Sequence, residues 1–391
     1  MNARFLVIAL LLVLQSDANL PATATRNAVT AGAKADGVAD DTATIQSILD
    51  GFSEPFTTGV LELPGGTYRI TRPLVYRGDY GYGVRIRGVH SAAQLSGTVL
   101  KWDGPPGGVV LELRGCTSTT VEHLAIDCAG KARAGIAITY DDENKKGTSG
   151  VYLDHLYING GVGPNSAAVV TGYRPDGTRD DRQCDRIILS NSTFVGSGDP
   201  GTTQYGFLAG WANCKNFAVR DCGFVGFGTG IKFGGSGYMI VDGFAGGSQT
   251  ITDFEGTTGN FEIRAGNSEQ STRLFTGATG SNPGSVTISN FSWASASTPG
   301  DGVIISYQGY LKLTGCDLRD YKWPGAVPLV RLDVMTNAPA SLDSSGNYYA
   351  NMTGQLPVID GRGKLLGPPH VRSFGDYGGV VGSLVYLRGI N

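Results

Sequence analysis

A short alternating pattern recurs along the chain and restricts the possible folds more than any other feature. Each copy is six residues long. Its first, fourth and sixth residues are apolar, its second and fifth face outward, and its third is small or polar. The copies are Val121–Ile126, Leu153–Ile158, Leu189–Phe194, Val219–Phe224, Ile288–Trp293 and Leu313–Leu318. Their third positions are 123, 155, 191, 221, 290 and 315, so the steps between successive copies are 32, 36, 30, 69 and 25. We interpret the longest step, from position 221 to position 290, as three coils, with weaker copies near Gly243 and Ala265.

A repeat of 20 to 50 residues is typical of a solenoid or array. Alternation within each copy indicates β-strands, which argues against helical and leucine-rich repeats. The glycine content, 60 of 391 residues, is about twice the usual ~7% and fits short strands joined by tight turns. We therefore predict an all-β parallel β-helix over residues 25–355, in which stacked coils bury one continuous apolar core. The pattern fades from about Leu356, and we expect residues 356–391 to form a C-terminal cap or an irregular tail.

The N-terminus has the layout of a secretory signal peptide. A positive start, Met1–Arg4, precedes ten apolar residues, Phe5–Leu14, and then small residues such as Ala22-Thr23-Ala24. Ten apolar residues are too few to cross a bilayer, which needs ~20. We expect residues 1–24 to be removed, which makes the protein secreted or periplasmic and free of the membrane. An uncleaved anchor or a misassigned start is the alternative.

Charge and metal-ligand spacing exclude several function classes. The formal net charge is −3 and there is no arginine- or lysine-rich run, so nucleic-acid binding has little electrostatic support. No CxxC pair occurs, and the four histidines are scattered. Spacing therefore predicts no zinc site, and we expect neither a metal nor a cofactor. No feature of the sequence indicates an oligomeric state.

The positions of the cysteines follow the repeat. Cys116, Cys184 and Cys214 each lie seven residues before the third position of a copy. Cys184 and Cys214 would then lie on neighbouring coils, ~4.8 Å apart, which is within the ~4.4–6.8 Å range of a disulfide. We predict a Cys184–Cys214 bridge or, failing that, a stacked column of thiols. Cys222 and Cys316 are expected to be buried core thiols.

The first coil contains a turn-rich segment followed by a helix. We expect Thr42–Gly51 to be helical, with Asp40 or Asp41 capping its positive end. The stretch Gly32–Gln46 resembles the entry motif of the pectate-lyase-like β-helix superfamily, and the match continues through Gly59–Ile70 and Val84–Gly88. This resemblance implies a right-handed parallel β-helix with a short N-terminal capping helix.

The superfamily includes glycoside hydrolases, polysaccharide lyases, epimerases and phage tailspikes, so the resemblance does not fix the reaction. The Gly-His-Gly of polygalacturonase-like hydrolases and the Asp-Pro-His of alginate epimerases are both missing. Asp180-Asp181 lies in a charged loop and not on a strand, and Gly230-Ile231-Lys232 matches the Arg-x-Lys element only faintly. No catalytic residue is therefore transferred from these groups. Asp36, Asp40 and Asp41 match family positions, with an expected role in the turn and the cap.

Two polar insertions, residues 141–146 and 174–182, interrupt neighbouring coils and should emerge at one edge of the solenoid, where insertions often form a binding face. Carboxylates, cations and aromatic rings together suit a sugar cleft, with two carboxyl groups for hydrolysis or a base and a cation for elimination. The catalytic candidates are Asp142, Glu143, Asp180, Asp181 and Lys232. The substrate-binding candidates are Tyr140, Tyr173, Arg182, Trp211 and Arg220.

Structural explanations compete with these assignments. The aromatic residues could form an interior ladder, and the charged loops could be solvated surface. Arg220 also belongs to an outward column with Asp154, Ser190 and Asp242, which predicts exposed cross-strand pairs. The leading hypothesis is an exported hydrolase or lyase whose partner is an acidic or pectin-like polysaccharide. A non-catalytic glycan-binding or structural β-helix and a tailspike-like virion protein are the alternatives.

Overall fold

The computed structural model describes residues 24–391 apart from positions 54–57, 79–82, 90–93, 211–214, 235–236, 255–258, 270, 278–283, 296–304, 308, 321–329, 334–340, 351–358, 363–369, 375, 379–384 and 388–391. The predicted signal peptide lies outside the described residues, except for its last residue, Ala24, which begins the first strand. Within the described ranges, no helix is long and apolar enough to cross a lipid bilayer.

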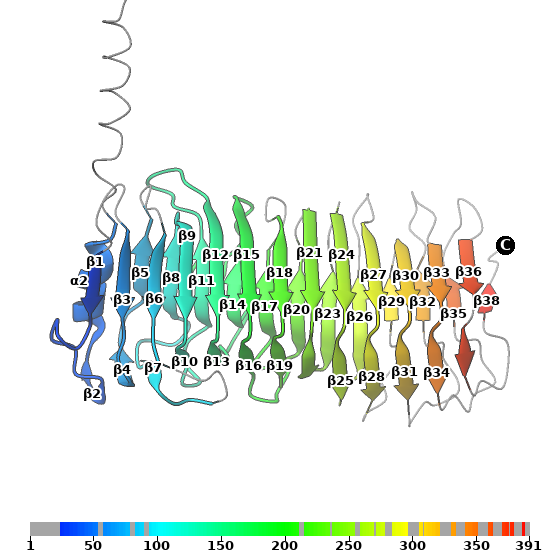
Figure 1. The fold of residues 1–391 in the computed structure, drawn as a ribbon, viewed down its shortest axis with the longest axis horizontal. Helices are drawn as coiled ribbons and strands as arrows, with labels where there is room; N and C mark the ends of the chain where they lie inside the picture. Colours follow the sequence, from blue (N-terminus) through cyan, green and yellow to red (C-terminus); the bar gives the residue numbers. More distant parts are fainter. Residues whose placement is uncertain are drawn as a thin grey trace, which may run out of the picture.

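The chain winds as a right-handed parallel β-helix, an elongated rod in which every coil adds one strand to each of up to three sheets (Figure 1). The described strands form sheets A, B and C with 13, 13 and 12 strands, and all pairings are parallel. Strands three apart in sequence order are hydrogen-bonded neighbours through most of the rod. The predicted fold class is thereby confirmed.

The strand bounds follow, sheet by sheet. Sheet A contains β1 (Ala24–Asn27), β3 (Gly59–Glu62), β6 (Val84–Arg87), β9 (Thr117–Glu122), β12 (Thr148–Asp154), β15 (Cys184–Ser190), β18 (Phe217–Arg220), β21 (Gly237–Asp242), β24 (Gly259–Arg264), β27 (Ser285–Ser289), β30 (Tyr310–Thr314), β33 (Ser341–Ser345) and β36 (His370–Phe374). Sheet B contains β2 (Asp36–Asp40), β4 (Gly66–Ile70), β7 (Thr98–Trp102), β10 (Ala125–Asp127), β13 (Tyr157–Asn159), β16 (Thr193–Val195), β19 (Gly223–Val225), β22 (Ala245–Gly247), β25 (Asn267–Glu269), β28 (Ser292–Ser295), β31 (Asp317–Asp320), β34 (Tyr348–Ala350) and β37 (Tyr377–Gly378). Sheet C contains β5 (Leu74–Arg77), β8 (Val109–Arg114), β11 (Ala134–Thr139), β14 (Ala167–Thr171), β17 (Tyr205–Ala209), β20 (Thr229–Phe233), β23 (Thr250–Phe254), β26 (Arg273–Gly277), β29 (Ile305–Tyr307), β32 (Val330–Asp333), β35 (Ile359–Arg362) and β38 (Val385–Leu387).

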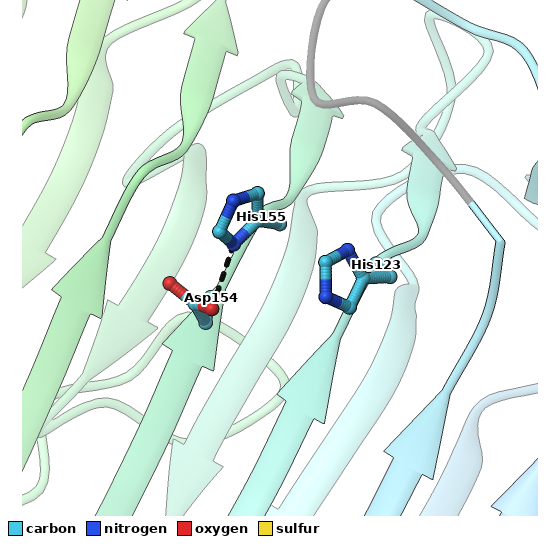
Figure 2. Close-up of side chains that lie close together, drawn as sticks. All are labelled: His123, Asp154 and His155. Atoms are coloured by element: carbon cyan, nitrogen blue, oxygen red, sulfur yellow. Dashed lines mark hydrogen bonds and ion pairs between the residues drawn. The ribbon is translucent and has the colours of Figure 1, made fainter.

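The third position of the repeat is a tight corner between sheets A and B, which we call the A–B corner. Its residues have positive φ, from His123 at 55° and His155 at 50° to Asn191 at 48°; Figure 2 shows the two histidines. Asp221, Gly243, Ala265, Asn290, Gly315 and Gly346 continue the column. Glycine adopts this left-handed conformation freely, and asparagine, aspartate and histidine are enriched there. The corners at Gly243 and Ala265 confirm that the longest step of the repeat, between Asp221 and Asn290, holds three coils.

The interior of the rod is filled by side chains that stack from coil to coil. Phe194, Phe224, Phe244 and Phe291 form one such stack, with ring centroids 4.8, 5.6 and 6.4 Å apart in succession. All four are buried. Phe194, Phe224 and Phe244 lie on three successive coils, whereas Phe291 meets Phe244 across the coil of Gly266, which has no side chain at that point. The column therefore links the coils through their core.

The N-terminal end is closed by the helix α2 (Thr42–Asp50). The Asp40 carboxylate accepts the backbone N–H of Thr42 at 3.0 Å, and the Asp41 carboxylate accepts the N–H groups of Lys34 and Ala35 at 2.6 and 3.0 Å. Asp36 accepts the N–H groups of Val38 and Ala39. The predicted role in the turn is thus confirmed for Asp36 and Asp41. At the helix end Asp40 accepts the hydrogen bond, whereas Asp41 occupies the N-cap position without a side-chain bond to the helix.

The C-terminal boundary predicted at residue 355 is wrong. Strands β35 to β38 continue all three sheets, with Ile359–Arg362 pairing with β32 and His370–Phe374 with β33. Their apolar alternation is weak, and the sequence pattern alone therefore did not reveal them. In a parallel sheet the backbone ladder extends the coil even where the apolar pattern fades.

Cys184 carries a free buried thiol, which contradicts the predicted Cys184–Cys214 disulfide. Cys214 itself lies outside the described residues. Cys184 lies opposite Thr148 on the preceding coil, and its sulfur contacts the carbonyl oxygen of Ile138 at 3.6 Å. Cys222 and Cys316 are buried free thiols as predicted.

Candidate functional site

The first insertion is a tight turn between β11 and β12. Asp141 and Lys146 pair through two backbone hydrogen bonds of 2.8 and 3.1 Å. The Asp141 carboxylate accepts the N–H of Glu143 at 3.0 Å, which fixes the turn from inside. Gly115, on the preceding coil, has φ of +56°, and a Cβ atom there would approach that of Asp141 to 2.7 Å. The turn therefore packs against Gly115 at a distance that leaves no room for a side chain at that position.

The second insertion does not project from the edge of the solenoid. Residues 174–182, which we call the covering loop, fold back over the outer face of sheet C. The Arg133 side chain holds this loop, donating to the carbonyl oxygen of Arg174 at 3.0 Å and to that of Pro175 at 3.1 and 3.2 Å. A further bond at 3.0 Å goes to the carbonyl oxygen of Asn165, and Arg133 is only 4% exposed.

Sheet C has an apolar outer face beneath and beside this loop. Six side chains form a buried cluster separate from the interior core: Val109, Ala134, Ala137, Ala167, Val170 and Leu208. Tyr173 packs against this cluster. The expectation that Tyr173 offers a ring to a sugar is therefore not supported, because the ring covers the outer face of the sheet.

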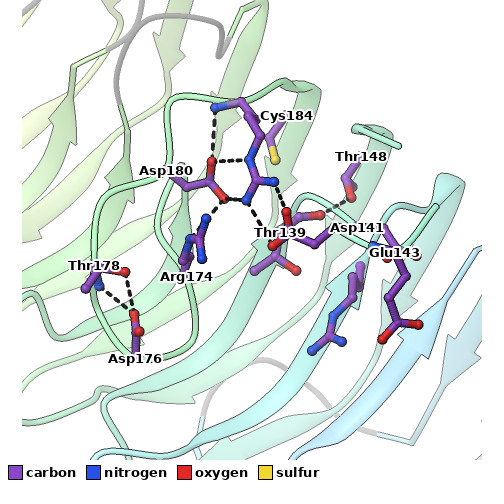
Figure 3. Close-up of polar contacts among 12 residues, drawn as sticks. Thr139, Asp141, Glu143, Thr148, Arg174, Asp176, Thr178, Asp180 and Cys184 are labelled. Atoms are coloured by element: carbon purple, nitrogen blue, oxygen red, sulfur yellow. Dashed lines mark hydrogen bonds and ion pairs between the residues drawn. The ribbon is translucent and has the colours of Figure 1, made fainter. Parts of the chain in front are cut away.

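A pocket of about 340 Å³ lies on the outer face of sheet C between the two insertions. We call it the outer pocket (Figure 3). It is lined by the strand residues Glu112, Arg114 and Thr139, by Tyr140 and residues 141–143 of the first insertion, and by Arg174, Pro175, Asp176 and Asp180 of the covering loop. The two insertions thus meet at one site, as predicted, although the second reaches it by folding inward.

Glu112 and Arg114 lie on the sheet side of the pocket. Glu112 is 2% exposed, although it points to the outer face of β8, between the core residues Leu111 and Leu113. Its carboxylate accepts two hydrogen bonds from the Arg114 guanidinium, at 2.8 and 2.6 Å, and one from the Thr139 hydroxyl at 2.7 Å. The Glu112 carboxylate holds the pKa of Arg114 above its ordinary value. Three hydrogen bonds from two side chains fix the orientation of this buried carboxylate.

Arg182 joins the two insertions. It donates to the Asp180 carboxylate at 2.7 and 2.6 Å and also pairs with Asp142. Its guanidinium carbon lies 4.3 Å from the ring centroid of Tyr140, a cation–π contact. One face of Tyr140 is therefore already occupied by Arg182, which positions the ring and leaves less of it for a ligand.

Glu143 forms the far rim of the pocket. Arg77 on β5 makes a bidentate ion pair with it, at 2.5 and 3.0 Å. The Arg77 guanidinium holds the pKa of Glu143 below its ordinary value.

The structure places three predicted site residues elsewhere. Lys232 is on β20, where its ammonium lies 3.3 Å from Asp253 and 5.7 Å from the ring centroid of Tyr205. Arg220 is on sheet A, in register with Ser190 and Asp242, as the alternative of an outward column predicted. Asp181 is 63% exposed and pairs with Arg179 at 3.1 Å. Trp211 lies outside the described residues.

The site residues predicted from the sequence did not include Glu112 and Arg114 on β8, or Arg174 in the covering loop. The signal was present in the run Leu111-Glu112-Leu113-Arg114, where two opposite charges occupy the outward positions of an apolar strand. A charged residue in such a strand is expected to be exposed. It is buried here because the covering loop closes over the sheet, and the local pattern cannot show that closure.

The chain resembles known proteins in sequence at the level of a family model, and in fold. The sequence model of the family described as "Rhamnogalacturonase A/epimerase, pectate lyase-like" matches residues 25–259, which include the outer pocket. No curated protein sequence matches the chain.

The chain resembles several solved structures, and two with TM-scores above 0.5 share its fold. The A-module of the Azotobacter vinelandii mannuronan C-5 epimerase AlgE4 has a TM-score of 0.52 and 14% identity, covering 93% of this chain and 97% of its own. The N-terminal fragment of bacteriophage Phi29 gene product 12 has a TM-score of 0.54 and 15% identity, covering 96% of this chain and 67% of its own. ORF18 of Geobacillus virus E2, with a TM-score of 0.36 and 13% identity, is matched over 90% of this chain, which spans 60% of that protein.

Proposed function

The chain belongs to the rhamnogalacturonase A/epimerase, pectate lyase-like family, and we propose that it cleaves an acidic polysaccharide bound in the outer pocket. The observation that supports this most is the pairing of arginines and carboxylates on facing walls. Arg114 comes from the sheet and Arg174 from the covering loop, and both line the same pocket as Glu112 and Asp180. Guanidinium groups recognise planar carboxylates such as those of uronates. A pocket of about 340 Å³ is at the lower end of the size of ligand pockets and suits a short stretch of glycan.

The ion pairs between the pocket carboxylates and arginines favour elimination over hydrolysis. Hydrolysis needs one carboxyl group that is protonated and acts as a general acid. Glu112, Asp180 and Glu143 each form an ion pair with an arginine instead, and Arg77 holds the pKa of Glu143 below its ordinary value. Ionised carboxylates suit a base that removes the proton next to a uronate carboxyl group, with an arginine stabilising the charge that develops.

Glu112 is the best candidate for that base. It lines the pocket and is oriented by both Arg114 and Thr139. Arg174 is the best candidate to neutralise the uronate, because it is half exposed and its nearest carboxylate contact, to Asp180, is 3.8 Å long. In this proposal Arg182 and Asp142 hold the two insertions together and do not take part in the reaction.

Names of related proteins support an acidic glycan as the substrate. The family description joins a rhamnogalacturonase with an epimerase, and the solved epimerase module is named for mannuronan. Export through the N-terminal signal peptide would bring the protein to such a polymer outside the cell. A non-catalytic glycan-binding role is the second candidate, favoured by the missing Gly-His-Gly and Asp-Pro-His motifs.

The test is an activity screen of the purified protein on pectins, rhamnogalacturonan, alginates and neutral glycans. New reducing ends and the ultraviolet absorbance of unsaturated uronates are both recorded. We expect reducing ends and unsaturation together from an acidic glycan. Reducing ends without unsaturation would replace the lyase with a hydrolase. Binding without any product would support the non-catalytic candidate, and product only from neutral glycans would refute the acidic substrate.

A further inference from the structure

Two histidines that are far apart in sequence lie face to face at the A–B corner. His123 and His155 occupy equivalent positions on neighbouring coils, and their rings stack with centroids 4.6 Å apart and planes at 28° (Figure 2). The strands that precede them are in register, with Leu153 opposite Val121. Coil register, and not local spacing, brings the two imidazoles together.

Asp154 completes a group of three possible metal ligands. One oxygen of its carboxylate lies 2.7 Å from Nδ1 of His155. The other accepts hydrogen bonds from the Ser190 hydroxyl at 2.7 Å and the Asn191 amide at 2.9 Å. These contacts fix the carboxylate and favour the His155 tautomer that is protonated on Nδ1, which leaves Nε2 with a free lone pair.

We propose that His123, His155 and Asp154 form a binding site for a divalent transition-metal cation such as Zn²⁺ on the outside of the rod. One ligand atom from each residue lies within 4.8 Å of the others. Two ligands of a tetrahedral zinc ion, with bonds of about 2.0–2.1 Å, lie roughly 3.4 Å apart. Small side-chain rotations would close that difference, because the His155 side chain is 42% exposed and has room to move.

The ligand types select the class of metal. Imidazole nitrogen together with a carboxylate suits Zn²⁺, Cu²⁺ or Ni²⁺, whereas Ca²⁺ takes six to eight oxygen ligands. Asp154 either contributes an oxygen directly or acts as the partner that orients His155. Water completes the coordination on the exposed side. A bound ion would link the coils of His123 and His155 outside the core.

This site is separate from the outer pocket, which lies on sheet C. Spacing of ligands along the sequence predicts no zinc site in this chain. That criterion does not apply in a solenoid, where ligands one coil apart become neighbours.

The test is isothermal titration of ZnCl₂ into the tag-free protein at pH 7.5, since a histidine tag would bind zinc itself. We expect one Zn²⁺ per chain, no binding of CaCl₂, and a melting temperature that rises with zinc.

The informative variants are His123→Asn and His155→Asn. Asn191 and Asn290 already occupy the same corner at positive φ, so asparagine should preserve the fold. We expect each variant to bind zinc at least tenfold more weakly, and Asp154→Asn to lose ten- to a hundredfold. His370→Asn on β36 is the matched control and should bind like the wild type. Absence of zinc binding up to 1 mM, or unchanged binding by both corner variants while folding is intact, would overturn the proposal.

Discussion

The guanidinium of Arg133 donates two hydrogen bonds, of 3.2 and 3.1 Å, to the carbonyl oxygen of Pro175. Arg133 is the residue directly before β11, and Pro175 lies in the covering loop. The contact turns a polar insertion into a cover for the apolar outer face of sheet C. It also places Arg174 and Asp180 against the outer pocket.

Replacing Arg133 with methionine should release the covering loop. Hydrogen bonds from a charged donor contribute roughly 1.5–3 kcal/mol, and we expect a loss of about 2–3 kcal/mol in the free energy of unfolding. Trypsin should also cleave the native variant faster at Arg179 or Arg182. Urea denaturation measures the stability loss, and mass spectrometry of the tryptic fragments measures the cleavage. Arg85→Met is the control, because Arg85 is half exposed and has one ion pair of 3.4 Å. Equal protease resistance of the Arg133 variant and the wild type would contradict the role of Arg133.

The phenylalanine column predicts where the core is most sensitive. Phe224 contacts Phe194 and Phe244 on the neighbouring coils, and Phe224→Ala should therefore cost about 3–5 kcal/mol in the free energy of unfolding. Val225→Ala, at an adjacent side chain that is 47% exposed, should change it by about 0.5 kcal/mol or less. Urea denaturation measures both variants. Similar losses for the two would show that the column does not stabilise the rod.

The fold could be predicted from the sequence because its signals are local. Alternation inside each copy shows strands, and the residues at the A–B corner are types that tolerate positive φ. The last coils escaped prediction because β35 to β38 have little apolar alternation. Their place is set by backbone pairing with the coil before them, and that pairing leaves no mark in the sequence.

Acid should weaken the rim of the outer pocket. The Arg77 guanidinium lowers the pKa of Glu143 from its ordinary value of 4.5, so the folded state binds this proton less readily than the unfolded chain. The stabilisation is therefore fully present above about pH 4.5 and is lost as the pH falls through the lowered value. The melting temperature of Glu143→Gln should be below that of the wild type at pH 7, and the difference should shrink as the pH is lowered from 7 to 3. A constant difference across this range would show that the ion pair contributes nothing.

The buried thiols should be unreactive in the native protein. Burial raises the pKa of Cys116 to about 11 and that of Cys184 and Cys222 to about 12, and only the thiolate reacts with Ellman's reagent. We expect no rapid reaction at pH 8 from the Cys214→Ser protein, and five thiols per chain after denaturation in guanidinium, since the sequence contains six cysteines.

The same titration settles the predicted disulfide. Unreduced, denatured wild-type protein should yield all six thiols, because Cys184 is free in the structure. A value of four would restore the bridge between Cys184 and Cys214.

The candidate site was predictable only in part. The two insertions could be assigned to neighbouring coils by counting residues, and Asp142, Glu143 and Asp180 do line one pocket. Lys232 was misplaced because β20 lies three pairings beyond β11 in sheet C. Glu112 was missed because its burial depends on a loop that starts two coils later and returns across the sheet.

The most direct test of the account compares the activities of the variants Glu112→Gln and Asp181→Asn. The substrate is the acidic glycan from which the wild type forms the most product. Both variants remove one negative charge, but Glu112 is buried in the pocket while Asp181 is 63% exposed and pairs with Arg179. We predict a fall in kcat of at least about a hundredfold for Glu112→Gln, as expected for the loss of a general base, with its melting temperature within a few degrees of the wild type. Asp181→Asn should stay within about twofold of the wild type, as expected for a surface change away from the site. Full activity in folded Glu112→Gln, or a large loss in Asp181→Asn, would contradict the assignment of the active site to the outer pocket.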